Sequence, residues 1–148
     1  MNSVLHAKRI PYILRHCRTI AVVGLSPKPH RASFDVANYL QGNGYRIIPI
    51  NPNATEVLGE KAYATLKEAA LHESIDLVDC FRNSEDIPPI VEEAIAIGAK
   101  GVWMQLGVSS PEAAARAEAA GLLVVQDRCI KIDHRVLLSS GELDLRPA

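Results

Sequence analysis

The chain lacks several features that mark special classes of protein. Its three cysteines are widely spaced and include no C-x-x-C pair, which argues against a disulfide framework. It has no apolar run long enough to cross a bilayer, and its first residues lack the charged-then-apolar order of a signal peptide. With a net charge of only −1, it has no electrostatic bias towards nucleic acid or anionic membranes. We therefore expect a cytoplasmic protein with no membrane or nucleic-acid partner.

Metal-ligand and catalytic patterns are also missing. No two of the five histidines form an H-x-x-x-H pair, so we expect no metal site. Cys129 and His134 could suggest a nucleophile and its base, but their spacing does not place both side chains on one helical face. We accordingly expect no catalytic residues.

What the chain does have is a regular alternation of short apolar runs and helical patterns. Expected strands cover 19–24, 46–50, 76–81, 101–105 and 122–125, and expected helices cover 5–17, 33–41, 65–71, 84–98 and 110–121. Strands that are apolar throughout indicate burial on both faces of a parallel sheet. The pattern predicts one α/β domain with a doubly wound parallel sheet of about five strands.

The expected boundaries divide the 148 residues into three parts. Residues 1–18 form an N-terminal helix packed on the domain, residues 19–138 form the sheet domain, and residues 139–148 form a flexible tail. Three caps are expected within the domain. Ser33 begins the helix after the first strand, Ser84 begins the helix after the third, and Ser110, followed by Pro111, begins the last one predicted.

The loop after the first strand is the strongest candidate for a binding site. It begins at Gly24 and carries Ser26, Lys28, Arg31 and Ser33 at the start of a helix. Backbone N–H groups and the positive helix end favour a phosphate there, whereas cations are unfavourable unless an anion joins them. The alternative is an ordinary strand–helix turn with solvated charges.

Polar groups also follow the later strands, and the carboxyl ends of parallel strands meet at one edge of the sheet. Asn51 and Pro52 follow the second strand, where NAD sites usually carry a carboxylate, so NADP remains possible. Phe81 and Arg82 follow the third, and Gln105 ends the fourth. Asn-Pro could equally be a simple turn, and Arg82 could pair with a nearby acidic residue.

These segments together carry a family resemblance. The matching motifs are Ala21–Ser26 with Arg31 and Ser33, Pro49–Pro52, Val78–Arg82, Glu92–Lys100, Trp103–Val108 and Asp127–Cys129. Over about residues 10 to 138, the chain resembles the small stand-alone CoA-binding proteins, which are similar to the nucleotide-binding domain of the succinyl-CoA synthetase α chain. The resemblance implies a Rossmann-like fold that binds coenzyme A.

The resemblance also implies roles for particular residues, according to the part of the ligand. At the diphosphate it implies Gly24, Ser26, Lys28, Arg31 and Ser33. At the adenosine portion it implies Asn51 and Pro52, with Phe81, Arg82 and Ile87 as the opposite wall. Gln105 is expected on the pantetheine side.

We expect a non-enzymatic carrier, sensor or regulator of acyl-CoA metabolism, because the related ligases also need a phosphorylatable histidine in another domain and an ATP-grasp module. The alternatives are an NADP-linked oxidoreductase, a subunit of an acyl-CoA ligase, or a module that binds a protein partner without a nucleotide. A homodimer is left open. A mixed disulfide between the CoA thiol and Cys80 or Cys129 is a further option.

Overall fold

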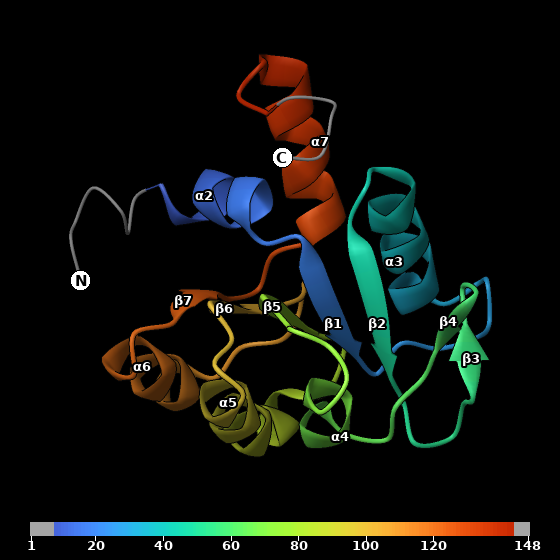
Figure 1. Ribbon diagram of the computed structural model, residues 1–148. Coiled ribbons are helices and arrows are strands. Elements are labelled where there is room, and N and C mark those ends of the chain that lie inside the picture. The colour runs from blue at the N-terminus through green and yellow to red at the C-terminus, as the bar shows by residue number, and fades with distance from the viewer. Residues whose placement is uncertain (1–7, 144–148) are drawn as a thin grey trace.

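A computed structural model describes residues 8–143. Its main sheet has five parallel strands in the order β2-β1-β5-β6-β7 (Figure 1). The strands are β1 (Thr19–Val23), β2 (Arg46–Ile50), β5 (Leu77–Cys80), β6 (Gly101–Met104) and β7 (Leu123–Val125). The chain reverses its direction of travel across the sheet between β1 and β5, and such a switch point is where open α/β sheets bind ligands.

Helices cover both faces of this sheet, as Figure 1 shows. On one face lie α2 (Arg9–His16), α3 (Ala32–Gly42) and α7 (Ile130–Ser140). On the other lie α4 (Leu66–Ala70), α5 (Ile87–Ala96) and α6 (Pro111–Ala119). Alternate residues of each strand serve the two cores: in β5, Leu77 packs with the first set, and Val78 and Cys80 pack with the second. The prediction of a doubly wound, Rossmann-like α/β domain is confirmed.

The helix after β1 starts differently from the prediction. It begins at Ala32 with Arg31 as N-cap, so Ser33 is already its second residue. The Ser33 hydroxyl oxygen instead accepts a hydrogen bond from the Ser26 N–H at 3.0 Å. The predicted cap of α6 is confirmed, because Ser110 Oγ accepts from the Ala113 N–H at 3.4 Å.

The segment before α5 also differs from the prediction. Ser84 begins a 3₁₀ turn, η1 (Ser84–Asp86), and α5 follows at Ile87. The Ser84 hydroxyl accepts a hydrogen bond from the Ser109 N–H at 3.0 Å and therefore does not cap its own helix. This bond ties the loop after β5 to the loop after β6.

Three elements lie outside the predicted set. A small antiparallel hairpin pairs β3 (Glu56–Val57) with β4 (Glu60–Lys61), and α7 follows β7. Ser139 and Ser140, which were expected in a tail, end α7, and residues 144–148 lie outside the described part. Residues 1–7 of the predicted N-terminal helix also lie outside it. Arg9 joins α2 to the sheet by donating from Nε to the Val124 carbonyl at 2.9 Å.

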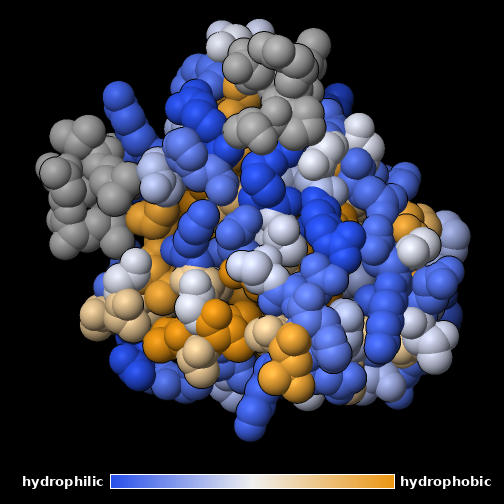
Figure 2. All heavy atoms as spheres, in the orientation of Figure 1, coloured by the Kyte–Doolittle hydropathy of each residue, from blue (hydrophilic) through white to orange (hydrophobic). Residues whose placement is uncertain are grey.

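Within residues 8–143, no helix is long and apolar enough to cross a membrane. Figure 2 shows one face that is largely hydrophilic, with hydrophobic side chains gathered over the region of α5 and α6. Buried apolar residues fill the two layers between the sheet and the helices.

Candidate functional site

Gly24 follows β1 at the candidate site, and contacts with the neighbouring strands fix its backbone position. Its φ of +85° lies in the left-handed region, and an added Cβ would lie only 2.4 Å from the carbonyl oxygen of Phe81. Its N–H donates to the Ile50 carbonyl at 2.9 Å, and the Phe81 N–H donates to the Val23 carbonyl at 2.9 Å. Only glycine fits where three strand ends approach so closely. The end of β1 is therefore locked to its neighbours β2 and β5.

The loop that follows is shaped by its own hydroxyl groups. Ser26 donates its N–H to Ser33 Oγ, and Ser26 Oγ accepts from the Lys28 N–H at 3.1 Å. Lys28 and Arg31 are exposed, and neither forms an ion pair within residues 8–143. Both lie at the amino end of α3, where the helix dipole disfavours cations. The loop thus places two positive charges close together, and no acidic side chain among the described residues pairs with either.

Asn51 connects the end of β2 to this loop. Its Nδ2 donates to the Leu25 carbonyl at 2.9 Å, and its Oδ1 accepts from the Asn53 N–H at 2.8 Å. The Asn51 side chain therefore holds the loop after β2 against the loop after β1. Pro52 is exposed and borders a cleft beside Gly24.

Two clefts open at the carboxyl edge of the sheet, and Arg82 lines both. We call one the α5 cleft; it is about 290 Å³, and its lining includes Gly24, Pro52, Thr65, Arg82 and Ile90. We call the other the α7 cleft; it is about 430 Å³, and its lining includes Val36, Phe81, Arg82, Gln105, Leu106 and Cys129. The Arg82 guanidinium Nε lies 3.7 Å from Asp86 Oδ2 and is half exposed. The Arg82 side chain therefore lies between the α5 cleft and the α7 cleft, which open on opposite sides of the sheet.

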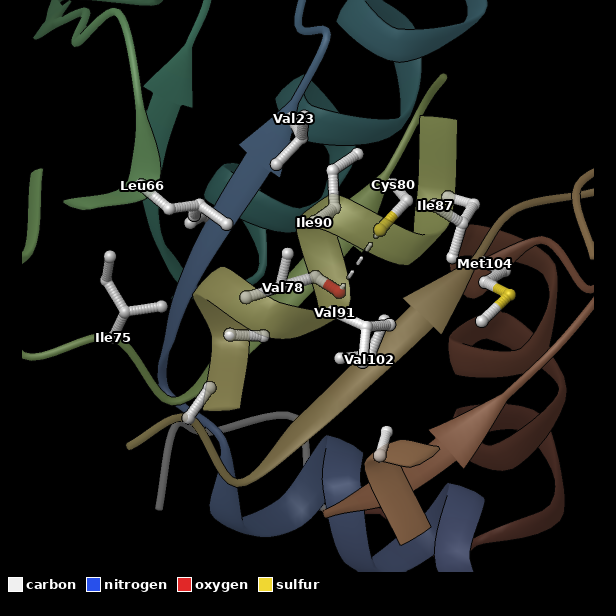
Figure 3. Packing of buried hydrophobic residues seen from close by; sticks show 14 of the residues in the cluster. Val23, Leu66, Ile75, Val78, Cys80, Ile87, Ile90, Val91, Val102 and Met104 are labelled. Carbon is white, nitrogen blue, oxygen red and sulfur yellow. Dashed lines mark hydrogen bonds between the residues drawn. The ribbon is translucent and has the colours of Figure 1, made fainter. Parts of the chain in front are cut away.

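Ile87, implied by the resemblance as part of the ligand wall, lies in neither cleft. It is fully buried and belongs to the core between the sheet and α5. Figure 3 shows it beside Cys80 and Met104. The first turn of α5 directs this side chain inward, so the structure places it under the site and not at the site's surface.

Gln105 makes a buried contact that the sequence interpretation did not anticipate. It is only 3% exposed, and its Nε2 donates to Asp79 Oδ1 at 2.6 Å. Asp79 lies in β5 between Val22 and Trp103 of the adjacent strands, and its Oδ2 has no hydrogen-bond partner. Complete burial raises the pKa of this carboxyl to about 7, although the hydrogen bond from Gln105 opposes the shift.

Among the described residues, His134 and Asp133 have side-chain hydrogen-bond partners other than Cys129. His134 Nδ1 lies 2.7 Å from the Tyr39 hydroxyl, and Asp133 accepts two hydrogen bonds from Arg128, at 2.6 and 2.8 Å. His134 is therefore engaged away from Cys129. Among the described residues, no group of three or more histidine, cysteine or acidic side chains could hold a metal ion.

The structure brings most of the implied residues to one edge. Gly24, Pro52, Phe81, Arg82 and Gln105 line the two clefts, and Lys28 and Arg31 lie on the adjoining loop. Sequence interpretation gave Asp79 no role and left open whether Cys80 or Cys129 could pair with the CoA thiol; in the structure it is Cys129 that lines a cleft. An aspartate inside an otherwise apolar strand is the signal that could have identified Asp79.

Comparisons with known proteins agree with this geometry. Residues 18–135 match a family model described as a CoA binding domain. The uncharacterised protein YneT of Bacillus subtilis (strain 168) is 42% identical over 127 residues, covering 86% of this chain and 93% of that protein. A solved structure of a hypothetical protein from Pyrococcus horikoshii OT3 has a TM-score of 0.84 at 40% identity, covering 88% of this chain and 91% of that one.

A further relative is a much longer enzyme. The ADP-forming acetate–CoA ligase II of Archaeoglobus fulgidus is 27% identical over 86 residues, which cover 57% of this chain and 12% of the ligase. The likeness is thus to one part of a ligase and to small proteins of similar length. On the match over residues 18–135, the chain belongs to the CoA binding domain family.

Proposed function

We propose that the chain binds coenzyme A or an acyl-CoA at the carboxyl edge of its sheet. One observation carries the proposal: Lys28 and Arg31 lie at the amino end of α3, in the loop that begins at Gly24, and neither has an acidic partner within residues 8–143. Two cations in this position raise the free energy of the unliganded protein, and a bound diphosphate would remove that cost. The family membership of residues 18–135 supports the same ligand.

The two clefts suggest how such a ligand would divide. The adenosine portion would occupy the α5 cleft beside Pro52, and the pantetheine arm would enter the α7 cleft towards Gln105. The diphosphate would lie between them, above Gly24 and near Arg82. The α7 cleft has a volume within the range usual for small-molecule sites and a largely apolar wall, which suits a flexible carbon chain.

We propose further that the protein acts without catalysis, as a cytoplasmic carrier, sensor or regulator in acyl-CoA metabolism. Two contacts support this role. Tyr39 contacts His134 Nδ1 and Arg128 pairs with Asp133, and within residues 8–143 no side-chain hydrogen bond joins either residue to Cys129. Activity as a ligase subunit would instead require a separate chain that supplies the ATP-dependent chemistry.

Calorimetric titration with CoA, dephospho-CoA and NADP tests the ligand. We expect CoA to bind, dephospho-CoA to bind more weakly, and NADP not to bind. The variants Lys28→Ala and Arg31→Ala should each weaken CoA binding by roughly 10- to 100-fold, since a charge-assisted hydrogen bond contributes about 1.5–3 kcal/mol.

Arg116→Ala is the matched control, because Arg116 is an exposed cation on α6 that pairs with Glu92 and lines neither cleft. Its CoA affinity should equal that of the wild type. Binding of NADP in place of CoA would favour an oxidoreductase. Unchanged CoA affinity in both loop variants would overturn the assignment of the diphosphate to this loop.

A further inference from the structure

We propose that Cys129 is a thiol–disulfide exchange site for the pantetheine end of CoA, so that the protein can carry CoA as a mixed disulfide. The inference rests on the proposed function, because it requires the pantetheine arm to lie in the α7 cleft. Of the three cysteines, the proposal gives this role to Cys129 alone, and it names CoA disulfide as the reaction partner. The fraction of protein that carries CoA would then depend on the redox state of the thiol pool.

The position of Cys129 is the first observation. It is the N-cap residue of α7, is half-buried, and lines the α7 cleft together with Arg82 and Gln105. Its side chain makes no capping hydrogen bond to the helix. The sulfur is therefore at the cleft that the pantetheine arm would enter and is not engaged in capping.

Gln105 provides an independent second observation. This side chain is 97% buried and lines the same cleft, and its Nε2 is committed to Asp79 behind it. Its Oε1 has no hydrogen-bond partner in the described part of the chain and is left as an acceptor on the cleft side. This oxygen is not among the fully buried unpartnered atoms, so it is open to the cleft and can accept a hydrogen bond from an N–H donor; the pantetheine arm carries two secondary amides. The cleft thus offers a specific contact to the part of CoA that leads to the thiol.

The segment that carries Cys129 is firmly held. Asp127 Oδ1 accepts from the Gly107 N–H at 2.7 Å, and the Trp103 indole Nε1 donates to the Arg128 carbonyl at 2.8 Å. Arg128 also makes its paired hydrogen bonds to Asp133. Cys129 therefore keeps a fixed position relative to the loop that follows Gln105, as an exchange site for a positioned ligand requires.

The other two cysteines do not meet these conditions. Cys80 is fully buried on the opposite face of the sheet, where its sulfur lies 4.0 Å from the Val78 carbonyl oxygen (Figure 3). Cys17 is 1% exposed at the end of α2, and burial raises its pKa to about 12. Exchange needs an accessible thiolate, so neither can serve without local unfolding.

The exchange balances without another oxidant. The Cys129 thiol releases its proton to solvent, and the thiolate attacks one sulfur of CoA disulfide. A new S–S bond joins Cys129 to CoA, the original S–S bond breaks, and the second CoA departs as a thiolate that takes up a proton. Attack by a CoA thiolate on the CoA sulfur of the mixed disulfide reverses the step, re-forming CoA disulfide and freeing the Cys129 thiolate. A dithiol reductant instead releases CoA as a thiol, frees Cys129 and is itself left as an internal disulfide.

The test uses the full chain and two probes. CoA disulfide carries the nucleotide, and pantethine, the disulfide of pantetheine, lacks it. Intact mass spectrometry should show one CoA added per chain after treatment with CoA disulfide, and a reductant should remove it. Peptide mapping should place the adduct on Cys129, and Cys129→Ser should not form it.

The loop variants connect this reaction to nucleotide recognition. Lys28→Ala and Arg31→Ala should slow the reaction with CoA disulfide by roughly 10-fold or more while leaving the rate with pantethine unchanged. Binding of reduced CoA, measured with reductant present, separates the two proposals. If reduced CoA binds but no adduct forms, or the adduct lies on Cys17 or Cys80, the exchange site is overturned and the proposed function stands. If reduced CoA does not bind, both fail.

Discussion

The Gln105 side chain donates to Asp79 Oδ1 at 2.6 Å, while the second carboxyl oxygen of Asp79 is buried without a partner. A carboxylate in this position has lost its water and gained only one hydrogen bond, so the folded protein favours the protonated form. The pair lies directly behind the α7 cleft and orients the amide that faces it. The buried Asp79 therefore orients Gln105, which lines the α7 cleft, although Asp79 itself does not line that cleft.

The first prediction concerns the pH dependence of stability. The folded-state pKa of Asp79, about 7, lies above its value in the unfolded chain. Its contribution to stability is therefore fully present below the unfolded pKa of about 3.9 and is lost as the pH rises towards 7. The loss is on the order of 4 kcal/mol.

The Asp79→Asn variant should remove this pH-dependent loss. Urea unfolding at several values between pH 4 and pH 8 should give a wild-type free energy of unfolding that falls relative to that of the variant. Asp35→Asn, which changes an exposed carboxyl, serves as the control and should follow the wild type. Parallel curves for wild type and Asp79→Asn would contradict the prediction.

The second prediction concerns Gly24. Gly24→Ala would place a methyl group 2.4 Å from the Phe81 carbonyl oxygen on a backbone with φ of +85°. We expect a loss of at least about 2 kcal/mol of stability in denaturant unfolding, because backbone strain and the steric clash add. The control is Gly42→Ala, where φ is not positive and nothing lies within 4 Å of the added carbon. That change should be neutral or stabilising.

The third prediction concerns the core position of Ile87. Ile87→Ala should lower the free energy of unfolding by about 2–5 kcal/mol, because it removes buried methyl groups and leaves a cavity under β5. Exposed Ile132→Ala, measured in the same unfolding experiment, should cost no more than about 0.5 kcal/mol. If the two variants were equally stable, Ile87 would not have the packing role that its burial implies.

The fourth prediction concerns Asn51. Removing its side chain in Asn51→Ala breaks the bond to the Leu25 carbonyl and the turn to Asn53, which loosens the loop after β1. We expect CoA affinity in calorimetry to fall by roughly 5- to 10-fold, equivalent to about one lost hydrogen bond. Asn53→Ala leaves both contacts of the Asn51 side chain in place and should bind CoA as the wild type does. Equal CoA affinity in the two variants would show that the hydrogen bonds of the Asn51 side chain do not position the loop after β1.

Much of the fold was predictable because its strands are apolar on both faces and its helices are amphipathic. Arg46–Ile50 is a strand over the whole predicted range, and Ser110 caps α6 as its position before Pro111 indicated. The start of α3 was not predictable to the residue, because Ser33 hydrogen-bonds to Ser26 across the loop. That choice depends on a tertiary contact and not on local preference.

The site, like the fold, has features that could be predicted from the sequence and others that could not. Charge and glycine placement predicted a loop with Gly24, Lys28 and Arg31, and the fold brings the ends of three other strands beside it. The resemblance implied Ile87 in the ligand wall, but the first turn of α5 directs this side chain into the core. Asp79 was hidden within an apolar run, and its role depends on the adjacent Gln105, which is distant in sequence.

The spread of the site along the chain has a consequence for folding. Gly24, Asn51, Arg82 and Gln105 follow four different strands, so no short fragment contains the site, and each pairing closes a long loop. A partly folded chain that lacks one of these strands lacks part of the site, so we expect it not to bind the ligand. On the proposed function, ligand binding therefore requires β1, β2, β5 and β6 to be assembled, and a ligand present during refolding would stabilise that assembly without aiding the earlier steps.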